Sequence, residues 1–177
     1  MNNTLPKRYA SSIFELAKEE NALCEVFEQL KLVEEVFEAN REIKLFFANF
    51  GVAKEIKLKI IDEIMTPKFN KNVINLMKLL VEKGRIQNLG EICKEFKKIY
   101  YEHEKIQEVT AISAVELSQE QRQGLVVALQ KRLEKSIELS ELIDSSIVGG
   151  LLIKYGDKML DASIRGRMIR LRKAMLL

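Results

Sequence analysis

The sequence predicts a mainly α fold, with an N-terminal six-helix bundle over residues 1–105 and a small α+β domain of β-α-β-β-α order over residues 106–177. Apolar residues recur every three or four positions in the first part, whereas short β-branched runs alternate in the second. Only two prolines and eight glycines interrupt the 177 residues. With so few breakers, long helices joined by short links are expected.

The first three helices follow from amphipathic spacing. Residues 4–20 form the first, with Thr4 as its N-cap and Pro6 in the first turn, where a missing N–H costs nothing. Its apolar arc is wider than one stripe, so one side can face the core and another side a partner. Residues 22–38 form the second helix, and residues 41–49 form a short third helix.

The next three helices are expected at residues 53–65, 70–83 and 86–104. A Thr-Pro pair ends the first of them, and Gly84 takes the C′ position after the second. Apolar residues cover most of the circumference of helix 70–83, which is typical of a central helix. Six helices in about 105 residues imply a compact bundle.

The period of the apolar residues changes after the bundle. Residues 108–117 alternate and are β-branched, which predicts a strand. Ser118 opens a capping sequence and a helix that continues to about residue 136. Residues 137–148 alternate again, which is typical of a second strand.

A hairpin and a last helix complete the chain. Residues 151–163 read as two short strands around the Gly156-Asp157 turn. Ser163 is expected to cap the last helix. An apolar stripe of that helix is expected to face inward: Ile164, Met168, Leu171 and Met175.

Charge gathers at the C-terminal end. Residues 154–177 carry seven Lys and Arg against two Asp, a net charge of +5, whereas the whole chain carries +3. A solvated helix face is the simplest interpretation, followed by an acidic protein partner and then by nucleic acid. The cations lie on the last helix: Arg165, Arg167, Arg170, Arg172 and Lys173.

The cysteines and the N-terminus indicate the compartment. Cys24 and Cys93 belong to no C-x-x-C pair and lie among apolar helical residues, so both are expected to be buried thiols in a reducing compartment. The first ten residues lack the apolar core of a signal peptide, and no apolar run is long enough to span a bilayer. We therefore expect a soluble intracellular protein.

The stretch 144–171 has the residue types of a site. Its glycines at 149, 150 and 156 lack the spacing of a phosphate-binding loop and are expected to shape bends and a turn. Asp144 and Asp161 could form a catalytic pair, but short acidic side chains at strand ends more often accept hydrogen bonds from backbone N–H groups.

The remaining chemistry-bearing residues give no site. His103 is the only histidine, so no metal-ligand cluster and no Ser-His-Asp arrangement can be built around it. Tyr100 and Tyr101 could stack on bases, but half-buried helix positions are expected. No cofactor, metal or catalytic residue is predicted.

The stretch 143–171, "IDSSIVGGLLIKYGDKMLDASIRGRMIRL", resembles the C-terminal signature of the delta subunit of F-type ATP synthase, the oligomycin-sensitivity-conferring protein of mitochondria. That pattern is Asp-x-Ser, Gly-Gly, Gly-Asp and Asp-Gly-Ser before an arginine-rich helix, and only Ala162 departs from it. The resemblance extends over the chain through "KRYASSIFELAKEE", "LVEKGRIQNLGEI" and "VTAISAVELSQEQ".

The resemblance implies a non-catalytic stator linker that resists rotor torque during proton-driven ATP synthesis. The helical domain would bind N-terminal helices of the alpha subunits, and the C-terminal domain would bind the b-type subunits of the peripheral stalk. One copy per complex is implied, held peripherally at the cytoplasmic face of the bacterial inner membrane, without cofactor or nucleic acid.

Site residues follow from that resemblance. One alpha helix is expected in a groove between the first and fifth helices, lined by Tyr9, Ile13, Leu76, Leu79 and Leu80. The stalk is expected at Arg165, Arg167 and Arg170. A scaffolding role is expected for the signature residues: Asp144, Gly149, Gly150, Gly156, Asp161 and Ser163.

Two other functions are open at this point. A nucleic-acid-binding module would use the arginines of the last helix, and its binding would fall steeply with salt. A small enzyme would use Asp144 and Asp161, and would need a concave pocket with shifted carboxylates.

Overall fold

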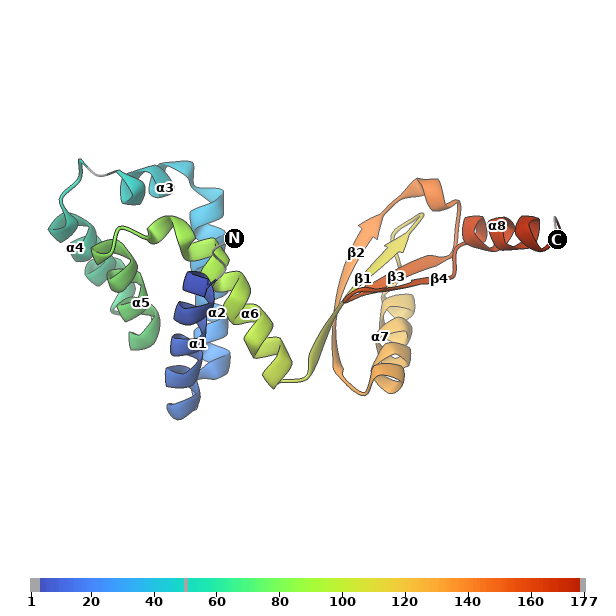
Figure 1. Cartoon of the computed structure of the whole chain (residues 1–177), viewed down its shortest axis with the longest axis horizontal. Coiled ribbons are helices and arrows are strands. Elements are labelled where there is room, and N and C mark those ends of the chain that lie inside the picture. The colour runs from blue at the N-terminus through green and yellow to red at the C-terminus, as the bar shows by residue number, and fades with distance from the viewer. Residues whose placement is uncertain (1–3, 50, 176–177) are drawn as a thin grey trace. The chain divides into compact units, whose positions relative to one another are not determined.

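A computed structural model describes residues 4–49 and 51–175 and confirms a mainly helical chain with a small mixed β-sheet. The chain divides between Glu102 and His103 into two compact units (Figure 1). The division lies three residues before the boundary expected from the sequence. Helices form the first unit, and the sheet lies in the second.

The helices of the first unit begin and end within two residues of the expected positions, apart from a short 3-10 turn at the start of the sixth. They are α1 (Thr4–Glu19), α2 (Leu23–Ala39), α3 (Arg41–Ala48), α4 (Lys54–Met65), α5 (Lys71–Glu82), η1 (Ile86–Asn88) and α6 (Leu89–His103). Thr4 is itself the first helical residue, so the expectation that it is the N-cap is wrong.

The core of the first unit is built from α1, α2, α5 and α6. Phe14 and Phe96 meet edge to face, with ring centroids 6.0 Å apart. Each fully buried side chain of this size contributes about 1.5–3 kcal/mol. Other buried members are Ala10, Ala17, Val26, Leu30, Met77, Leu80 and Ile92.

The end of α5 is closed as the sequence predicts. Gly84 has φ +64° and follows the C-cap, so it occupies C′. Arg85 N–H donates to Leu80 O at 2.8 Å, and Gly84 N–H donates to Val81 O at 3.1 Å. This pair of bonds is a Schellman motif, which satisfies carbonyls that the helix itself leaves free.

A buried lysine closes α3. Lys57 of α4 donates from Nζ to Phe47 O at 2.8 Å and to Asn49 O at 2.7 Å. The ammonium thereby satisfies carbonyls at the C-terminal end of α3, where positive charge is favourable. The contact fixes the end of α3 to α4.

Among its described residues the second unit has four strands, which match the four expected strand segments, whereas the expected β-α-β-β-α order names only three. Its elements are β1 (Ile106–Ser113), α7 (Gln119–Leu133), β2 (Ser136–Ile143), η2 (Ser145–Ile147), β3 (Leu151–Tyr155), β4 (Lys158–Asp161) and α8 (Ile164–Met175). The alternating run 137–148 also ends earlier than expected, since η2 follows Ile143.

The sheet has the order β2-β1-β3-β4. β1 pairs parallel with β2 and antiparallel with β3, and β3 pairs antiparallel with β4. β1 is therefore bonded along both of its edges.

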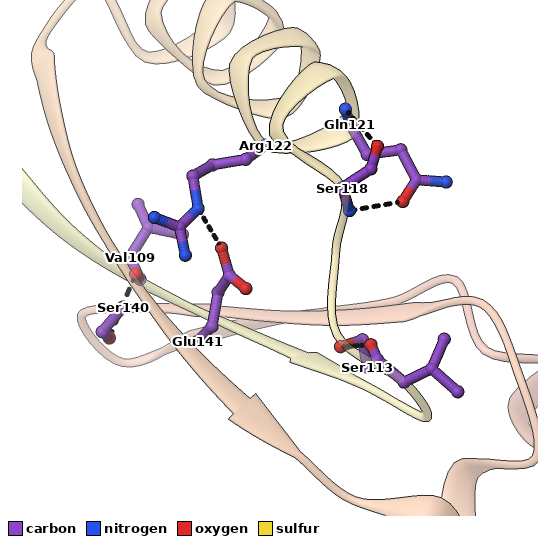
Figure 2. A network of polar contacts seen from close by, with 8 residues as sticks. Val109, Ser113, Ser118, Gln121, Arg122, Ser140 and Glu141 are labelled. Carbon is purple, nitrogen blue, oxygen red and sulfur yellow. Dashed lines mark hydrogen bonds and ion pairs between the residues drawn. The ribbon is translucent and has the colours of Figure 1, made fainter.

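Helix α7 covers one face of this sheet (Figure 1). Val109, Leu129 and Ile153 form the buried centre between the helix and the strands. Figure 2 shows the capping box that begins α7, in which Gln121 N–H donates to Ser118 Oγ at 3.2 Å and Ser118 N–H donates to Gln121 Oε1 at 3.0 Å. The prediction that Ser118 opens this helix is confirmed.

Helix α8 contradicts one expectation. Its stripe was expected to face inward, but Met168 and Leu171 are 65% and 64% exposed, and Ile164 and Met175 are exposed as well. Among the α8 residues whose side chains the structure describes, only Gly166 is buried. The described part of the stripe stays exposed because α8 is anchored mainly at its start, where Ile164 N–H donates to Gly149 O and Gly166 N–H donates to Ser163 Oγ.

Candidate docking surfaces

Of the five residues expected in the groove between α1 and α5, the structure buries three and leaves two accessible. Ile13, Leu76 and Leu80 are core residues, with Leu80 fully buried, so their side chains offer no surface to a partner. The wide apolar arcs of α1 and α5 are used by packing within the bundle, which the sequence could not distinguish from partner binding. Tyr9 and Leu79 remain accessible.

An outward-facing line on α1 extends this surface. Tyr9 is half-buried, and its hydroxyl accepts a hydrogen bond from Arg85 Nη1 at 3.0 Å. Leu16, two turns later, is 50% exposed. Across from α1, Leu79 of α5 is 37% exposed. The accessible apolar side chains on α1 and α5 are therefore Leu16 and two of the five expected residues, Tyr9 and Leu79, and the groove itself stays a prediction.

A second apolar surface lies elsewhere in the helical unit. α2, α3, α4 and α5 enclose an apolar hollow of about 670 Å³, a volume in the range of ligand pockets. Leu32, Val36 and Ile64 line it and are exposed, whereas Ile61 and Met77 are buried within it. Sequence reasoning missed the hollow because each helix was assigned an ordinary core-facing stripe, and only the packing shows where such stripes fail to meet.

In the second unit, the signature residues fix the start of α8. Asp161 Oδ1 accepts hydrogen bonds from Ser163 N–H at 2.8 Å and from Ser163 Oγ–H at 2.6 Å. Ser163 Oγ in turn accepts from Gly166 N–H at 2.9 Å, so Ser163 is the N-cap of α8. These bonds lower the pKa of Asp161, with the Ser163 side chain contributing most, then its backbone N–H and the nearby Arg170.

Gly150, just before β3, allows the backbone to approach the residues before α8 closely. Its φ is +82°, a conformation that side chains rarely adopt. A Cβ at this position would lie 2.6 Å from Ala162 O. Next to it, Gly149 O accepts from Ile164 N–H at 2.9 Å. The glycine pair thus lets β3 and the start of α8 pack backbone against backbone, whereas Gly156 lies in the β3–β4 turn.

Before this glycine pair the chain makes a strained corner. Asp144 Oδ1 accepts from Ser146 N–H at 2.9 Å, and the hydrogen bonds of Ser146, side chain first, lower the pKa of Asp144. Val148 then has φ +66° and ψ −37° and is 71% exposed. A β-branched residue in this region is an outlier, and such strain is often kept at functional sites.

The expected stalk-binding arginines lie on the exposed part of α8. Arg165, Arg167 and Arg170 are all exposed. Arg170 Nη2 donates to Asp161 O at 3.2 Å, which ties one guanidinium back to the sheet. Within the part of the chain that the structure describes, no arginine of α8 forms a salt bridge.

The two aspartates do not have the properties of a general-acid pair. Their pKa values are lowered by hydrogen bonds, whereas a general acid at neutral pH needs a raised pKa. Over residues 4–49 and 51–175, no group of three or more His, Cys, Asp or Glu could hold a metal ion. No described helix is long and apolar enough to cross a bilayer.

The aromatic pair and Cys93 are structural, whereas Cys24 is not. Tyr100 and Tyr101 are buried, and Phe27 stacks on Tyr100 with ring centroids 4.4 Å apart, so neither ring is free to stack on a base. Cys93 is buried, and burial raises the pKa of its thiol to about 12. Cys24 is exposed, contrary to expectation, because it lies on the side of α2 opposite the buried Val26.

Comparisons with known proteins agree over nearly the whole chain. A family model described as the ATP synthase delta (OSCP) subunit matches residues 5–175. The ATP synthase subunit delta of Fusobacterium nucleatum is 34% identical over 168 residues, which cover 95% of this chain and 96% of the relative. A relative from Ilyobacter tartaricus, named ATP synthase subunit delta, sodium ion specific, is 33% identical over 159 residues, covering 90% and 91%.

A solved structure shares the fold. One chain of the mitochondrial ATP synthase hexamer of Toxoplasma gondii superposes with a TM-score of 0.76 at 26% identity, covering 98% of both chains. Nucleic-acid binding by the arginines of α8 finds no support in these comparisons.

Proposed function

Because the chain belongs to the ATP synthase delta (OSCP) family, we propose that it is the stator linker of an F-type ATP synthase. It joins the catalytic head to the peripheral stalk and resists rotor torque during ATP synthesis. It carries out no chemistry and needs no cofactor. One copy per complex is held peripherally at the cytoplasmic face of the bacterial inner membrane through its partner subunits.

One observation supports this role most directly: each compact unit carries its own exposed apolar surface. Tyr9, Leu16 and Leu79 provide one on the helical unit, and the stripe of α8 provides another on the sheet-bearing unit. Where exposed apolar residues lie together in a patch, they mark protein interaction sites. A protein that links two bodies requires separate docking surfaces.

We assign the head to the helical unit. An N-terminal helix of an alpha subunit would lie along α1 and α5, with its apolar side chains against Tyr9 and Leu79, in the helix-in-groove mode. We assign the stalk, built of b-type subunits, to the second unit, where Arg165, Arg167 and Arg170 would face acidic side chains.

The test is a calorimetric titration of the full-length protein with a synthetic N-terminal segment of the alpha subunit, at two salt concentrations. We expect one-to-one binding with a negative heat-capacity change and little salt dependence, since apolar burial drives it. Leu79→Ser should weaken binding by about 1–3 kcal/mol. Leu45→Ser is the matched control, because Leu45 is an exposed leucine on α3.

Two outcomes would contradict this assignment. Absence of binding by a folded protein would remove the head contact from the helical unit. Loss of binding in Ile64→Ser but not in Leu79→Ser would move the contact from α1 and α5 to the hollow lined by α2, α3 and α4.

A further inference from the structure

Helix α8 is poorly stabilised by its own chain. It has 12 residues, and helices of this length are marginal in water unless something packs on them. Arg165 and Arg167 lie in its first turns, where the helix dipole disfavours cations, and no acidic residue lies in its first turn. Arg167 and Arg170, three positions apart, also repel each other. The helix therefore lacks a partner that would cover it.

The apolar residues of α8 have the spacing of a coiled-coil seam. The spacings between Ile164, Met168, Leu171 and Met175 are four, three and four residues. At 100° per residue these four side chains fall within about 60° of arc. This is the narrow a/d seam of a coiled coil, whereas a helix that lies on a membrane presents a broader apolar face.

The charged residues beside the seam share one sign. With Met168 at position a and Leu171 at position d, Arg165 and Arg172 take e positions and Arg167 takes a g position. All three side chains are exposed. Charges at e and g choose the partner, because they pair across the seam. A second copy of α8 would place arginine against arginine, so self-pairing is disfavoured.

The start of α8 is anchored to the sheet by hydrogen bonds. Ile164 N–H donates a hydrogen bond to Gly149 O. The residue before Gly149 is Val148, which is exposed and has a strained backbone conformation. The Asp161–Ser163–Gly166 bonds hold the first turn of α8 in place. A pre-positioned helix start costs less ordering entropy on binding than a free one.

We propose that α8 is one half of a short two-helix coiled coil, completed by an amphipathic helix with apolar a/d residues and with Glu or Asp at its e and g positions. The seam residues Ile164, Met168, Leu171 and Met175 pack against the partner, and Arg165, Arg167 and Arg172 pair with its carboxylates. This inference deepens the proposed function and rests on it, since the second unit is the one assigned to the stalk.

The test uses two synthetic peptides of about three heptads, identical with Leu at a and d, and with either Glu or Lys at every e and g position. Full-length protein should bind the Glu peptide at least about tenfold more tightly than the Lys peptide. The variant Arg165→Glu/Arg167→Glu/Arg172→Glu should reverse that preference. Circular dichroism must show native helix content in the triple variant, because net charge alone would also favour the Lys peptide for an unfolded chain.

Substitutions on α8 test the seam itself. Leu171→Ser should weaken binding of the Glu peptide by about tenfold. Ile169→Ser is the matched control, because Ile169 is an exposed apolar residue on the opposite side of the helix, and its affinity should stay within about twofold. Equal losses in both variants, or no discrimination between the peptides, would overturn the proposal.

Two further arms separate this proposal from its rivals. Tighter association with phosphatidylglycerol vesicles than with the Glu peptide would assign α8 to a lipid surface instead. Capture of purified b-type stalk subunits by both wild type and the triple variant would overturn the seam and leave the proposed function standing. Failure of wild type to capture the stalk subunits would contradict the proposed function, while the peptide preference would still decide the seam.

Discussion

Leu79 and Leu80 are adjacent in sequence and chemically identical, yet the structure gives them opposite surroundings. Leu80 is fully buried, whereas Leu79 is 37% exposed on the outer side of α5. Truncating each to Ala should therefore separate stability from partner binding. The comparison tests the correction that the structure makes to the expected groove.

The magnitudes follow from burial. Leu80→Ala loses the transfer free energy of a buried leucine and leaves a cavity, which together cost about 3–4 kcal/mol. Leu79→Ala loses only part of a side chain's burial and opens no cavity, so it should cost about 1 kcal/mol. A small domain has about 5–15 kcal/mol of stability, so both variants should remain folded.

The assay is urea unfolding followed by circular dichroism, with native-state hydrogen exchange of the α5 and α1 amides. Hydrogen exchange is needed because the two units can unfold separately, and a single transition then does not report on the helical unit alone. Titration with the alpha-subunit peptide completes the experiment, and only Leu79→Ala should lose affinity while stability remains near that of the wild type.

Equal stability of Leu80→Ala and wild type would refute the placement of Leu80 in the core. A loss of stability in Leu79→Ala as large as in Leu80→Ala would show that Leu79 is also a core residue and would remove it from the docking surface.

Three other predictions concern the second unit and the cysteines. Gly150→Ala should destabilise the second unit by about 2–4 kcal/mol, since it adds a clash with a backbone carbonyl to an unfavourable φ; faster hydrogen exchange of β3 with unchanged α5 would be the signature. In the native protein at pH 8, Cys24 should react with a thiol reagent and Cys93 should not, because burial raises the Cys93 pKa to about 12; equal labelling of both would contradict the burial of Cys93. The hydrogen bonds that lower the pKa of Asp161 stabilise the fold most when this carboxylate is ionised. Their contribution is fully present above the unfolded-state pKa of 3.8 and is lost as the pH falls through the lower folded-state pKa. Unfolding free energies measured against pH should show this loss below pH 3.8, and Asp161→Asn should abolish it.

Helix positions were predictable because they depend on local features that the sequence displays. The apolar period set the helices, and Gly84 and Ser118 marked a helix end and a helix start through backbone chemistry that needs no distant contact. Over the described residues 4–49 and 51–103, the six α-helices therefore lie within two residues of their expected ranges, apart from the start of α6.

The partition of apolar residues between core and surface was not predictable in the same way. A wide apolar arc on α5 predicts burial on several sides, but only the positions of its neighbours decide that Leu80 is enclosed and Leu79 is not. The exposed stripe of α8 and the exposed Cys24 were mispredicted for the same reason. An apolar pattern on a helix predicts that something packs against it, but not whether that is another part of the same chain or a partner protein.

The strand order of the second unit has a mechanical consequence. The chain enters the sheet at the first residue of β1 and leaves it at the last residue of β4. The two antiparallel pairings through β3 make β1 and β4 run in the same direction. Tension applied between the start of β1 and α8 therefore pulls these strands lengthwise past each other, perpendicular to their hydrogen bonds. The bonds of each ladder must then break together under shear rather than one after another as in an opening zipper, so the sheet is suited to carrying sustained load between its two ends.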